Sequence, residues 1–266
     1  MNYSQNLAVN QHLTFCGKNK TCPPTNTSLQ NSLGADNIAL LNKIRLIAKS
    51  QGKEAYLFGG AVRDCLLGNE PHDLDILVNG AALEFAKELH KQDKKTFIGT
   101  FLKPSVKRAI VHTKGMNMDI VPLINDGSTA KNKDEIRAAL IKKSMSSDFT
   151  VNSMIIKLGE NENGELKLKL IDNLSAKKDL RENRLKGVNK EEFRENPVLA
   201  LRGRRYQKRY KMKTEFETSD LIKEHIKHPK CTGNPLRVAK ELYKLGTETK
   251  NPFTILKYLF SYKLFK

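Results

Sequence analysis

A short stretch around residue 60 limits the possible folds more than any other part of the sequence. Residues 55–58 form an apolar run typical of a buried strand, and Gly59-Gly60 follows directly. Residues 61–67 then carry apolar side chains at helical spacing and end at Gly68. The alternating run 73–78 predicts a further strand. A strand, a glycine turn, a helix and another strand predict an α/β sheet and argue against a helical bundle.

The other apolar patterns extend this sheet and then change to helices alone. Helices are predicted over 38–48 and 81–92, strands over 96–102, 107–113 and 118–123, and a hairpin over 154–158 and 166–171. Beyond residue 175 the patterns are helical, over 175–183, 190–195, 197–210, 218–228, 235–245 and 252–260. We therefore predict an α/β (α+β) head domain with a mixed sheet over 36–180, followed by an all-helical neck over 181–266.

The first 35 residues differ in composition from the rest. They are rich in Asn, Gln, Ser and Thr, contain no Asp or Glu, and show no apolar period, so a disordered polar tail is predicted. His12, Cys16 and Cys22 lie in this tail and fit no common zinc spacing. The four cysteines of the chain are too few and too scattered for a disulfide framework, which indicates a reducing compartment.

The charge of the chain restricts its partners. The sequence has 47 Lys and Arg against 29 Asp and Glu, a net charge of +18 that favours polyanions such as nucleic acid or anionic lipid. A lysine-rich composition without functional meaning is the alternative. No run of about 18 apolar residues occurs, and residues 1–10 lack the regions of a signal peptide. We expect a cytoplasmic protein that neither spans a membrane nor is secreted.

Three aspartates are candidate metal ligands. Asp73 and Asp75 begin a predicted strand, whose alternation turns both carboxylates to one side with their backbones about 6–7 Å apart. Asp119 lies in another predicted strand and supplies a third carboxylate if the two strands are neighbours. A divalent cation such as Mg²⁺ would neutralise this cluster. The alternative is that Asp73 caps a turn while Asp75 and Asp119 are exposed strand residues.

The glycine turn is a candidate phosphate site. Gly59 and Gly60 let backbone N–H groups approach phosphate oxygens, and the following helix adds a favourable dipole. Arg63 is expected in the first turn of that helix as a charged donor. A glycine turn, an arginine and two aspartates within 17 residues, 59–75, predict a phosphate site beside a metal site.

The same residues are similar to a family signature. Leu-Phe-Gly-Gly-Ala-Val-Arg-Asp-Cys-Leu-Leu-Gly over 57–68 and His-Asp-Leu-Asp-Ile-Leu-Val over 72–78 resemble the signature of class II tRNA nucleotidyltransferases and bacterial poly(A) polymerases. Segments over 148–154, 171–180 and 193–206 resemble further motifs of this family in the same order. The resemblance extends over about residues 55 to 210, the head and neck of such enzymes.

The resemblance implies a fold, a reaction and a set of site residues. It implies a polymerase-β-like head in which Asp73, Asp75 and Asp119 hold Mg²⁺. The reaction would transfer a nucleotide from ATP, and in one interpretation from CTP, to an RNA 3′ hydroxyl. The nucleotide-binding residues that the resemblance implies are Gly59, Gly60, Arg63, Asp148, Asn152, Asn196, Arg202 and Arg205.

The chain departs from the family pattern where the base is recognised. The family uses the Asp and Arg of Glu-Asp-x-x-Arg, and this sequence has Asn196 and Leu199 there. Asn196 can still pair with a base edge, whereas Leu199 has no polar atom. Loss of one bidentate partner typically costs about 1–3 kcal/mol of base discrimination, so an altered choice of nucleotide is expected. Ser147 also stands where the family has an arginine before Asp148.

Residues 202–213 are strongly basic. They include seven Lys and Arg and no Asp or Glu, with Tyr206 and Tyr210 one helical turn apart. For the tyrosines, core packing is favoured over stacking on bases. Contact with RNA is favoured over a merely solvated helix face for the basic side chains Arg204, Lys208, Arg209 and Lys211.

Three functions are compatible with these features. The first is completion or repair of the CCA end of tRNA, and the second is addition of A alone or of poly(A). The third is a catalytically weak RNA-binding protein of the same fold, against which the retained aspartates argue. The family usually continues through further helical domains that hold tRNA. For a chain that ends at Lys266, either the short neck suffices or a homo-oligomer or helper subunit supplies this grip.

Overall fold

The computed structural model of the chain describes residues 25–227 and 235–249. The predicted helix over 252–260 and the cysteines of the predicted tail lie outside these ranges. No helix in the described ranges is long and apolar enough to cross a membrane.

The chain divides into two compact units that alternate along the sequence. Unit 1 takes Met1–Val78, Ala82–Val121 and Ile156–Leu170, and unit 2 takes Asn79–Ala81, Pro122–Ile155 and Ile171–Lys266. Along the chain, residues 122–155 belong to unit 2 and residues 156–170 belong to unit 1. The division into a head over 36–180 and a neck over 181–266 stays a prediction.

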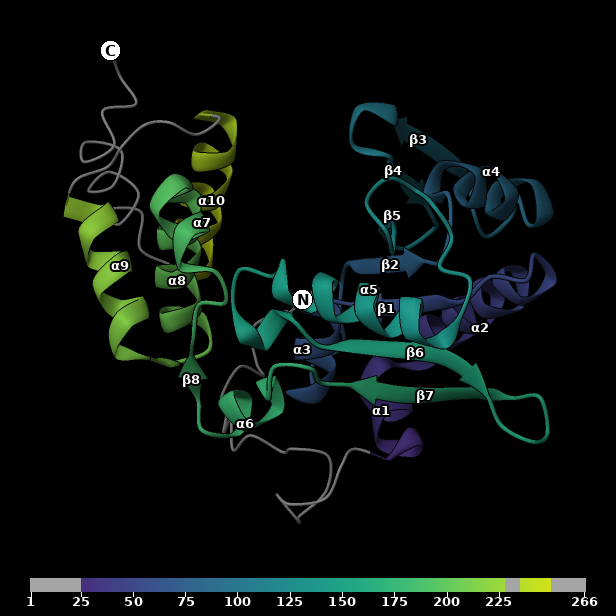
Figure 1. The fold of residues 1–266 in the computed structure, drawn as a ribbon, viewed down its shortest axis with the longest axis horizontal. Helices are drawn as coiled ribbons and strands as arrows, with labels where there is room; N and C mark the ends of the chain where they lie inside the picture. Colours follow the sequence, from purple (N-terminus) through teal and green to yellow (C-terminus); the bar gives the residue numbers. More distant parts are fainter. Residues whose placement is uncertain (1–24, 228–234, 250–266) are drawn as a thin grey trace, which may run out of the picture. The chain divides into compact units, whose positions relative to one another are not determined.

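Unit 1 is built on a seven-stranded sheet in the order β3-β4-β5-β2-β1-β6-β7 (Figure 1). The strands β1 and β2, β3 and β4, and β4 and β5 pair antiparallel. The predicted α/β sheet is confirmed. Its hairpin β6–β7 comes later in the sequence than the other five strands, after a segment that belongs to unit 2. The strands are β1 (Ala55–Phe58), β2 (Leu74–Val78), β3 (Gly99–Lys103), β4 (Arg108–His112), β5 (Asn117–Pro122), β6 (Ile155–Glu160) and β7 (Leu166–Ile171).

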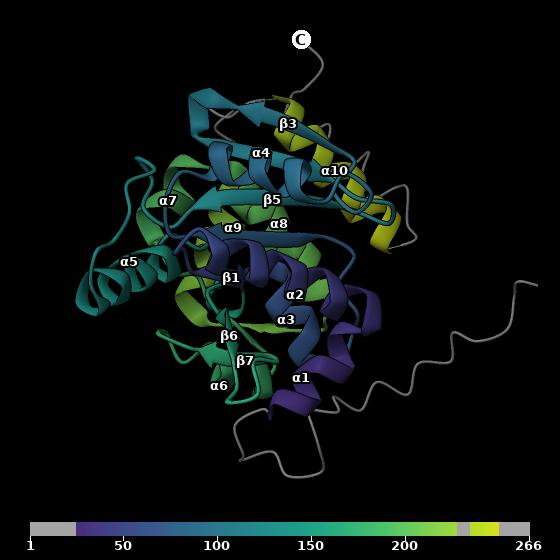
Figure 2. The same cartoon turned by 90° about the vertical axis from the view of Figure 1, so that its right-hand side faces the viewer.

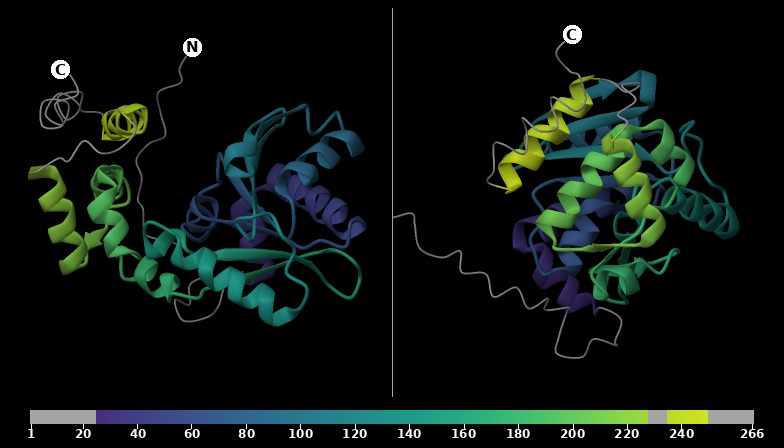
Figure 3. Two further views of the ribbon diagram at one scale, coloured as in Figure 1. Left: turned by 45° about the horizontal axis from the view of Figure 1, so that its top comes forward. Right: turned by 90° about the vertical axis from the view of Figure 1, so that its left-hand side faces the viewer.

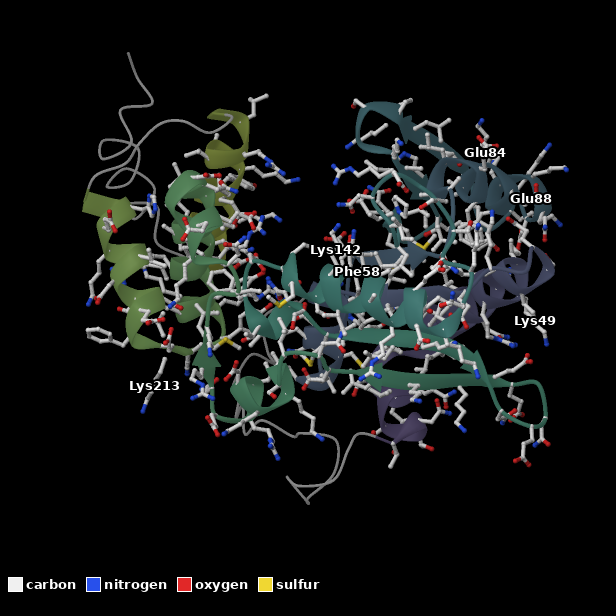
Figure 4. All side chains as sticks on the ribbon, viewed as in Figure 1. Lys49, Phe58, Glu84, Glu88, Lys142 and Lys213 are labelled. Carbon is white, nitrogen blue, oxygen red and sulfur yellow. The ribbon has the colours of Figure 1, made fainter. Side chains whose placement is uncertain are left out.

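Helices of unit 1 cover one face of this sheet (Figure 2). They include α2 (Ala35–Ser50), α3 (Gly60–Leu66) and α4 (Ala82–Gln92). The sequence of α4 explains its orientation, because Phe85 and Leu89 are fully buried while Glu84 and Glu88 point away from the strands (Figure 4). Burying a large apolar side chain stabilises the fold by about 1.5–3 kcal/mol, which fixes this helix on the sheet.

The predicted tail is corrected over its last ten residues. Residues 26–33 form a helix, α1 (Asn26–Leu33), which begins at Thr25, whose hydroxyl accepts a hydrogen bond from the N–H of Ser28 at 3.1 Å. Leu29 and Leu33 of α1 are fully buried. Two apolar residues one turn apart are too few to give a periodic signal, and their burial depends on α2 and α3, which pack against α1.

Unit 2 is mainly helical. In it α8 packs against both α9 and α10 (Figure 3). The predicted bounds of α7 are confirmed. Helix α5 was not predicted, because its apolar residues do not lie along one face of the helix and Leu140 is the one of them that is buried. The elements are α5 (Lys133–Met145), α6 (Ala176–Arg181), α7 (Lys190–Glu195), α8 (Pro197–Arg209), α9 (Phe216–Lys227) and α10 (Pro235–Thr249), the short helix η2 (Thr150–Asn152), and the parallel strands β8 (Arg184–Leu185) and β9 (Lys213–Thr214).

An apolar core joins the helices of unit 2. Val198 and Leu201 of α8 pack with Val238, Leu242 and Leu245 of α10. These positions recur at helical spacing in both sequences, so one face of each helix meets the other. The basic residues of α8 are therefore attached to a helix whose orientation is fixed by burial.

Candidate active site

The glycine turn of unit 1 lies against a carboxylate. Gly59 follows β1 and has a φ of +74°, which side chains rarely adopt. The pairing of β1 with β2 places Phe58 opposite Asp75. A methyl group added at Gly59 would lie 3.4 Å from Oδ2 of Asp75. The turn proposed for phosphate and one carboxylate proposed for a metal are therefore direct neighbours.

The other two predicted metal ligands differ in their surroundings. Asp73 precedes β2 by one residue and is exposed, whereas Asp75 is half-buried. Asp119 lies in β5, the strand next to β2, and its side chain is 32% exposed. Its Oδ2 atom is 3.8 Å from Nη1 of Arg108 in β4. Asp119 thus has a cationic neighbour already.

The donor chemistry of these aspartates fits Mg²⁺, because carboxylate oxygens are the ligands that this ion prefers. In the part of the chain that the structure describes, no three His, Cys, Asp or Glu side chains gather closely enough to hold a metal. The structure brings Asp75 to the glycine turn but does not gather Asp73, Asp75 and Asp119 into one cluster. Their role as metal ligands stays a prediction.

Arg63 lies behind the glycine turn. Its side chain is 6% exposed, and its Nη2 atom donates to both carboxylate oxygens of Asp64 at 2.9 and 3.0 Å. A methyl group at Gly60 would lie 3.5 Å from that Nη2 atom. The positive charge therefore supports the turn from inside unit 1, and its contact with a triphosphate stays a prediction.

Sequence reasoning missed Arg108. In the antiparallel register Ile110 of β4 pairs with Asp119 of β5, and Arg108 lies two residues before Ile110 on the same side of the sheet. Its Nε atom is buried without a hydrogen-bond partner among the described residues. The signal that would have found it is the pairing of β4 with β5, which the sequence does not specify.

In unit 2 the predicted nucleotide ligand Asp148 is held rigidly. Its Oδ1 atom accepts hydrogen bonds from the N–H of Phe149 and from Nδ2 of Asn152, both at 2.8 Å. Asn152 is buried and also donates to the hydroxyl of Tyr206 at 3.2 Å. The side chain of Asp148 is only 9% exposed, so its orientation is fixed before any ligand binds.

Two predicted nucleotide-binding residues of α8, Arg202 and Arg205, are paired with carboxylates in the structure, and their contact with a nucleotide stays a prediction. Nη1 of Arg202 donates to Oδ2 of Asp148 at 2.7 Å, and Nη2 lies 3.4 Å from Glu241 of α10. Arg205 is buried and donates to Glu241 at 3.1 Å and to Glu248 at 3.0 Å. Burial disfavours the charged form of Arg202, yet the charges around it, Asp148 foremost, outweigh this and raise its pKa. Both arginines remain charged at neutral pH.

The altered base-recognition positions have structural tasks. Oδ1 of Asn196 accepts a hydrogen bond from the N–H of Val198 at 3.3 Å, which caps the N-terminus of α8. Leu199 is 3% exposed and belongs to the apolar interior. The cap engages the Oδ1 atom of the half-buried Asn196, whereas Leu199 has no polar atom to offer in place of the family's arginine.

The basic segment after Arg202 divides into paired and exposed side chains. Nη1 of Arg204 donates to Gln207 at 3.1 Å, and Arg209 forms an ion pair with Glu248 at 2.9 Å. Lys208 and Lys211 are exposed, as is Lys213, which points outward in Figure 4. The exposed lysines are therefore the side chains of this segment best placed for RNA, a role that stays a prediction.

The aromatic residues of this region form a core. Tyr206 is 5% exposed, and its ring centroid lies 5.5 Å from those of Phe149 and Tyr210. Phe193 packs edge-on against Phe149 at 5.4 Å. The predicted packing role of Tyr206 is confirmed, because a ring enclosed in this way cannot stack on a base.

Known proteins share this architecture. Residues 55–186 match the family described as the poly A polymerase head domain. The A-adding tRNA nucleotidyltransferase of Aquifex aeolicus is 31% identical over 181 residues, which are 65% of this chain and 20% of that protein. A CCA-adding enzyme solved with CTP superimposes with a TM-score of 0.73 at 26% identity, over 90% of this chain and 54% of that chain.

A second solved structure agrees. The CCA-adding enzyme of Thermotoga maritima, complexed with tRNA, superimposes with a TM-score of 0.70 at 27% identity, over 90% of this chain and 53% of that chain. The chain thus spans about half the length of the two solved chains and a fifth of the Aquifex aeolicus protein.

Proposed function

The chain belongs to the family of the poly(A) polymerase head domain and class II tRNA nucleotidyltransferases, and on this premise we propose that it adds nucleotides to RNA 3′ ends. Its substrates are a nucleoside triphosphate, which is ATP and in one form of the reaction also CTP, and the 3′ end of tRNA. The observation that carries the proposal is the position of Asp75 beside the Gly59 turn, since nucleotidyl transfer needs phosphate and metal ligands side by side.

The residues of unit 1 have distinct tasks in this reaction. Backbone N–H groups at Gly59 and Gly60 hold phosphate oxygens, and Arg63, which is paired with Asp64, supports the turn from behind. Asp73 and Asp75, with Asp119 from the adjacent strand, would hold Mg²⁺. Bound Mg²⁺ supplies Lewis-acid chemistry, activating the RNA 3′ hydroxyl and neutralising the departing pyrophosphate.

Addition of A alone is the second candidate reaction. The observation that favours it is the loss of one of the family's base-recognition groups, since buried, apolar Leu199 stands where the family has an arginine. The named relative from Aquifex aeolicus is an A-adding enzyme, which supports the same choice. The exposed lysines of the 202–213 segment, Lys208, Lys211 and Lys213, supply the electrostatic attraction for RNA in either reaction. We place the reaction in the cytoplasm, and a second copy or helper subunit for holding tRNA stays a prediction.

The experiment supplies the purified chain with Mg²⁺ and tRNA lacking its 3′ end, with each labelled triphosphate alone and then with all together. Ordered addition of C, C and A identifies the first reaction, and incorporation of A alone identifies the second. Intact RNA binding without incorporation would refute the enzymatic proposal.

A pair of variants tests the assigned carboxylate. Asp75→Asn is expected to lower the transfer rate at least about 100-fold, because one charged ligand is lost, while RNA binding persists. Asp220→Asn is the matched control, since Asp220 is an exposed carboxylate of α9 whose side chain is 51% accessible. Equal rates for the two variants would contradict the role of Asp75.

A further inference from the structure

We propose that the corner between α1 and α2, residues 34–37, positions the candidate metal ligand Asp73, and that Asn37 is the positioning residue. The corner holds the loop of residues 67–73, which leads from α3 to β2. The inference rests on the proposed nucleotidyl transfer, because it concerns the same metal site. It brings in residues that precede the matched head domain, residues 55–186.

Asp73 is held less firmly by the sheet than Asp75. The register of β2 with β1 begins at Asp75, which pairs with Phe58, whereas Asp73 precedes β2 by one residue. Asp73 is exposed and Asp75 is half-buried. Because Mg²⁺ demands near-ideal octahedral geometry, a ligand just outside the strand needs support from the loop that carries it.

The side-chain amide of Asn37 supplies this support. Asn37 lies in α2 and is 2% exposed. Its Nδ2 atom donates to the carbonyl oxygen of Leu33 at 2.9 Å and to Oε1 of Glu70 at 3.2 Å, and it lies 3.4 Å from the carbonyl oxygen of Pro71. Three acceptors converge on an amide that has two hydrogens, so its donor capacity is fully used. These contacts fix the loop two and three residues before Asp73.

Close packing at Gly34 adds a second contact with the same loop. Gly34 separates α1 from α2 and has a φ of +82°. A methyl group added there would lie 2.5 Å from Oε1 of Glu70, so either the corner or the carboxylate would have to move. Glycine is therefore required at this position for space as well as for backbone conformation.

The corner is itself anchored in unit 1. Leu29 and Leu33 of α1 are fully buried, and α1 packs against both α2 and α3. Helix α3 follows the glycine turn and precedes the loop that carries Asp73. The α1–α2 corner therefore belongs to the same packed body as both parts of the candidate site, and it can hold a ligand in a fixed place.

The test measures Mn²⁺ binding to the full chain by electron paramagnetic resonance, in the presence of a non-hydrolysable ATP analogue. Mn²⁺ is the probe because it takes the same oxygen ligands as Mg²⁺. Asn37→Leu keeps the approximate size of the side chain but removes the amide, so the Kd for Mn²⁺ is expected to rise about tenfold. The KM for RNA is expected to stay the same, because the lysines proposed to attract RNA belong to unit 2. Far-UV circular dichroism melting verifies that each variant is folded.

Gln30→Leu is the matched control for Asn37→Leu. Nε2 of Gln30, in α1, donates to the carbonyl oxygen of Leu166 in β7 at 3.3 Å. The control therefore also removes an amide that bonds to a distant backbone carbonyl, but one outside the loop of residues 67–73. Its Kd for Mn²⁺ is expected to equal that of the unchanged chain.

A pair of glycine variants decides the question if Asn37→Leu does not fold. Gly34→Ala and Gly52→Ala both place alanine at positive φ, +82° and +64°. A methyl group at Gly52 has no atom of the described residues within 4 Å, whereas one at Gly34 meets Glu70. Gly34→Ala is expected to raise the Kd for Mn²⁺, and Gly52→Ala is expected to leave it unchanged.

A double substitution tests whether the effect passes through Asp73. Asp73→Asn removes a charged ligand and is expected to weaken Mn²⁺ binding by itself. If Asn37 acts by positioning Asp73, adding Asn37→Leu to this variant should raise the Kd by less than about twofold more. A further rise as large as that in the unchanged background would overturn the positioning role, because Asn37 would then act independently of Asp73.

The outcomes separate this inference from the proposed function. If the unchanged chain incorporates nucleotides and Asn37→Leu binds Mn²⁺ as tightly as that chain does, positioning is refuted while nucleotidyl transfer stands. Equal losses in a variant and its control, or no Mn²⁺ binding by the unchanged chain, also refute positioning. A chain that binds Mn²⁺ but incorporates no nucleotide refutes the proposed function, and the Kd values still decide the role of Asn37.

Discussion

Glu241→Gln should destabilise unit 2 by about 2–3 kcal/mol. The carboxylate is 5% exposed, and the substitution weakens one charge-assisted hydrogen bond of 3.1 Å to Arg205 and a longer contact of 3.4 Å to Arg202. Removing one partner of a buried ion pair costs about 3–5 kcal/mol when the other charge is left alone. Arg205 retains Glu248 at 3.0 Å, so the expected loss lies below that range.

The measurement is urea unfolding followed by far-UV circular dichroism, with Asp220→Asn as control. Asp220 forms an exposed ion pair with Lys223 at 3.2 Å, and its loss should cost no more than about 0.5 kcal/mol. Because the Glu241 contacts are buried, the difference from the unchanged chain should persist between about 0.05 and 0.5 M salt. A Glu241→Gln variant as stable as the Asp220→Asn control would refute the reasoning.

Three further predictions concern other parts of the chain. Gly59→Ala should reduce nucleotide transfer more strongly than Gly164→Ala. Both glycines have positive φ angles, +74° and +78°, but only the substitution at Gly59 brings a methyl group against Asp75. Similar activities of the two variants in the incorporation assay would contradict this. Leu29→Ala should cost about 2–4 kcal/mol in the same urea experiment, since Leu29 is fully buried, and a loss below about 0.5 kcal/mol would mean that α1 is not part of the core. Burial, and then the charge of Asp148, raise the pKa of Glu192 above 4.5, so the contribution of Glu192 to folding stability is present below pH 4.5 and is lost as pH rises through the raised pKa. Glu192→Gln should therefore increase the melting temperature at pH 7 but not at pH 4. Equal shifts at both pH values would refute this assignment.

The regular elements were largely predictable because their signals are local. Three elements have the predicted bounds: strand β1 before the glycine turn, strand β7 of the hairpin, and the short helix α7. Each depends on neighbouring residues along the chain, through alternation, helical spacing or glycine conformation. Helix α1 was missed because its two buried leucines give a signal only when other helices pack on them.

The candidate site was predictable in part. The pairing of β1 with β2 places Asp75 beside Gly59, as expected from two strands joined by a short helix. The partner of Asp119 was not predictable, because Arg108 reaches it through the register of β4 with β5. Strand register depends on the whole sheet, so the short motif that carries each residue does not reveal it.

By itself the sequence determined the fold class, the position of the glycine turn and the family, because these follow from residue types at fixed spacing. Only the tertiary structure decided what the arginines of α8 do. Their partners Glu241 and Glu248 lie more than thirty residues further along the chain, and the packing of α8 on α10 brings them together. Ion pairs form through space after burial has oriented the helices, so no sequence spacing encodes them.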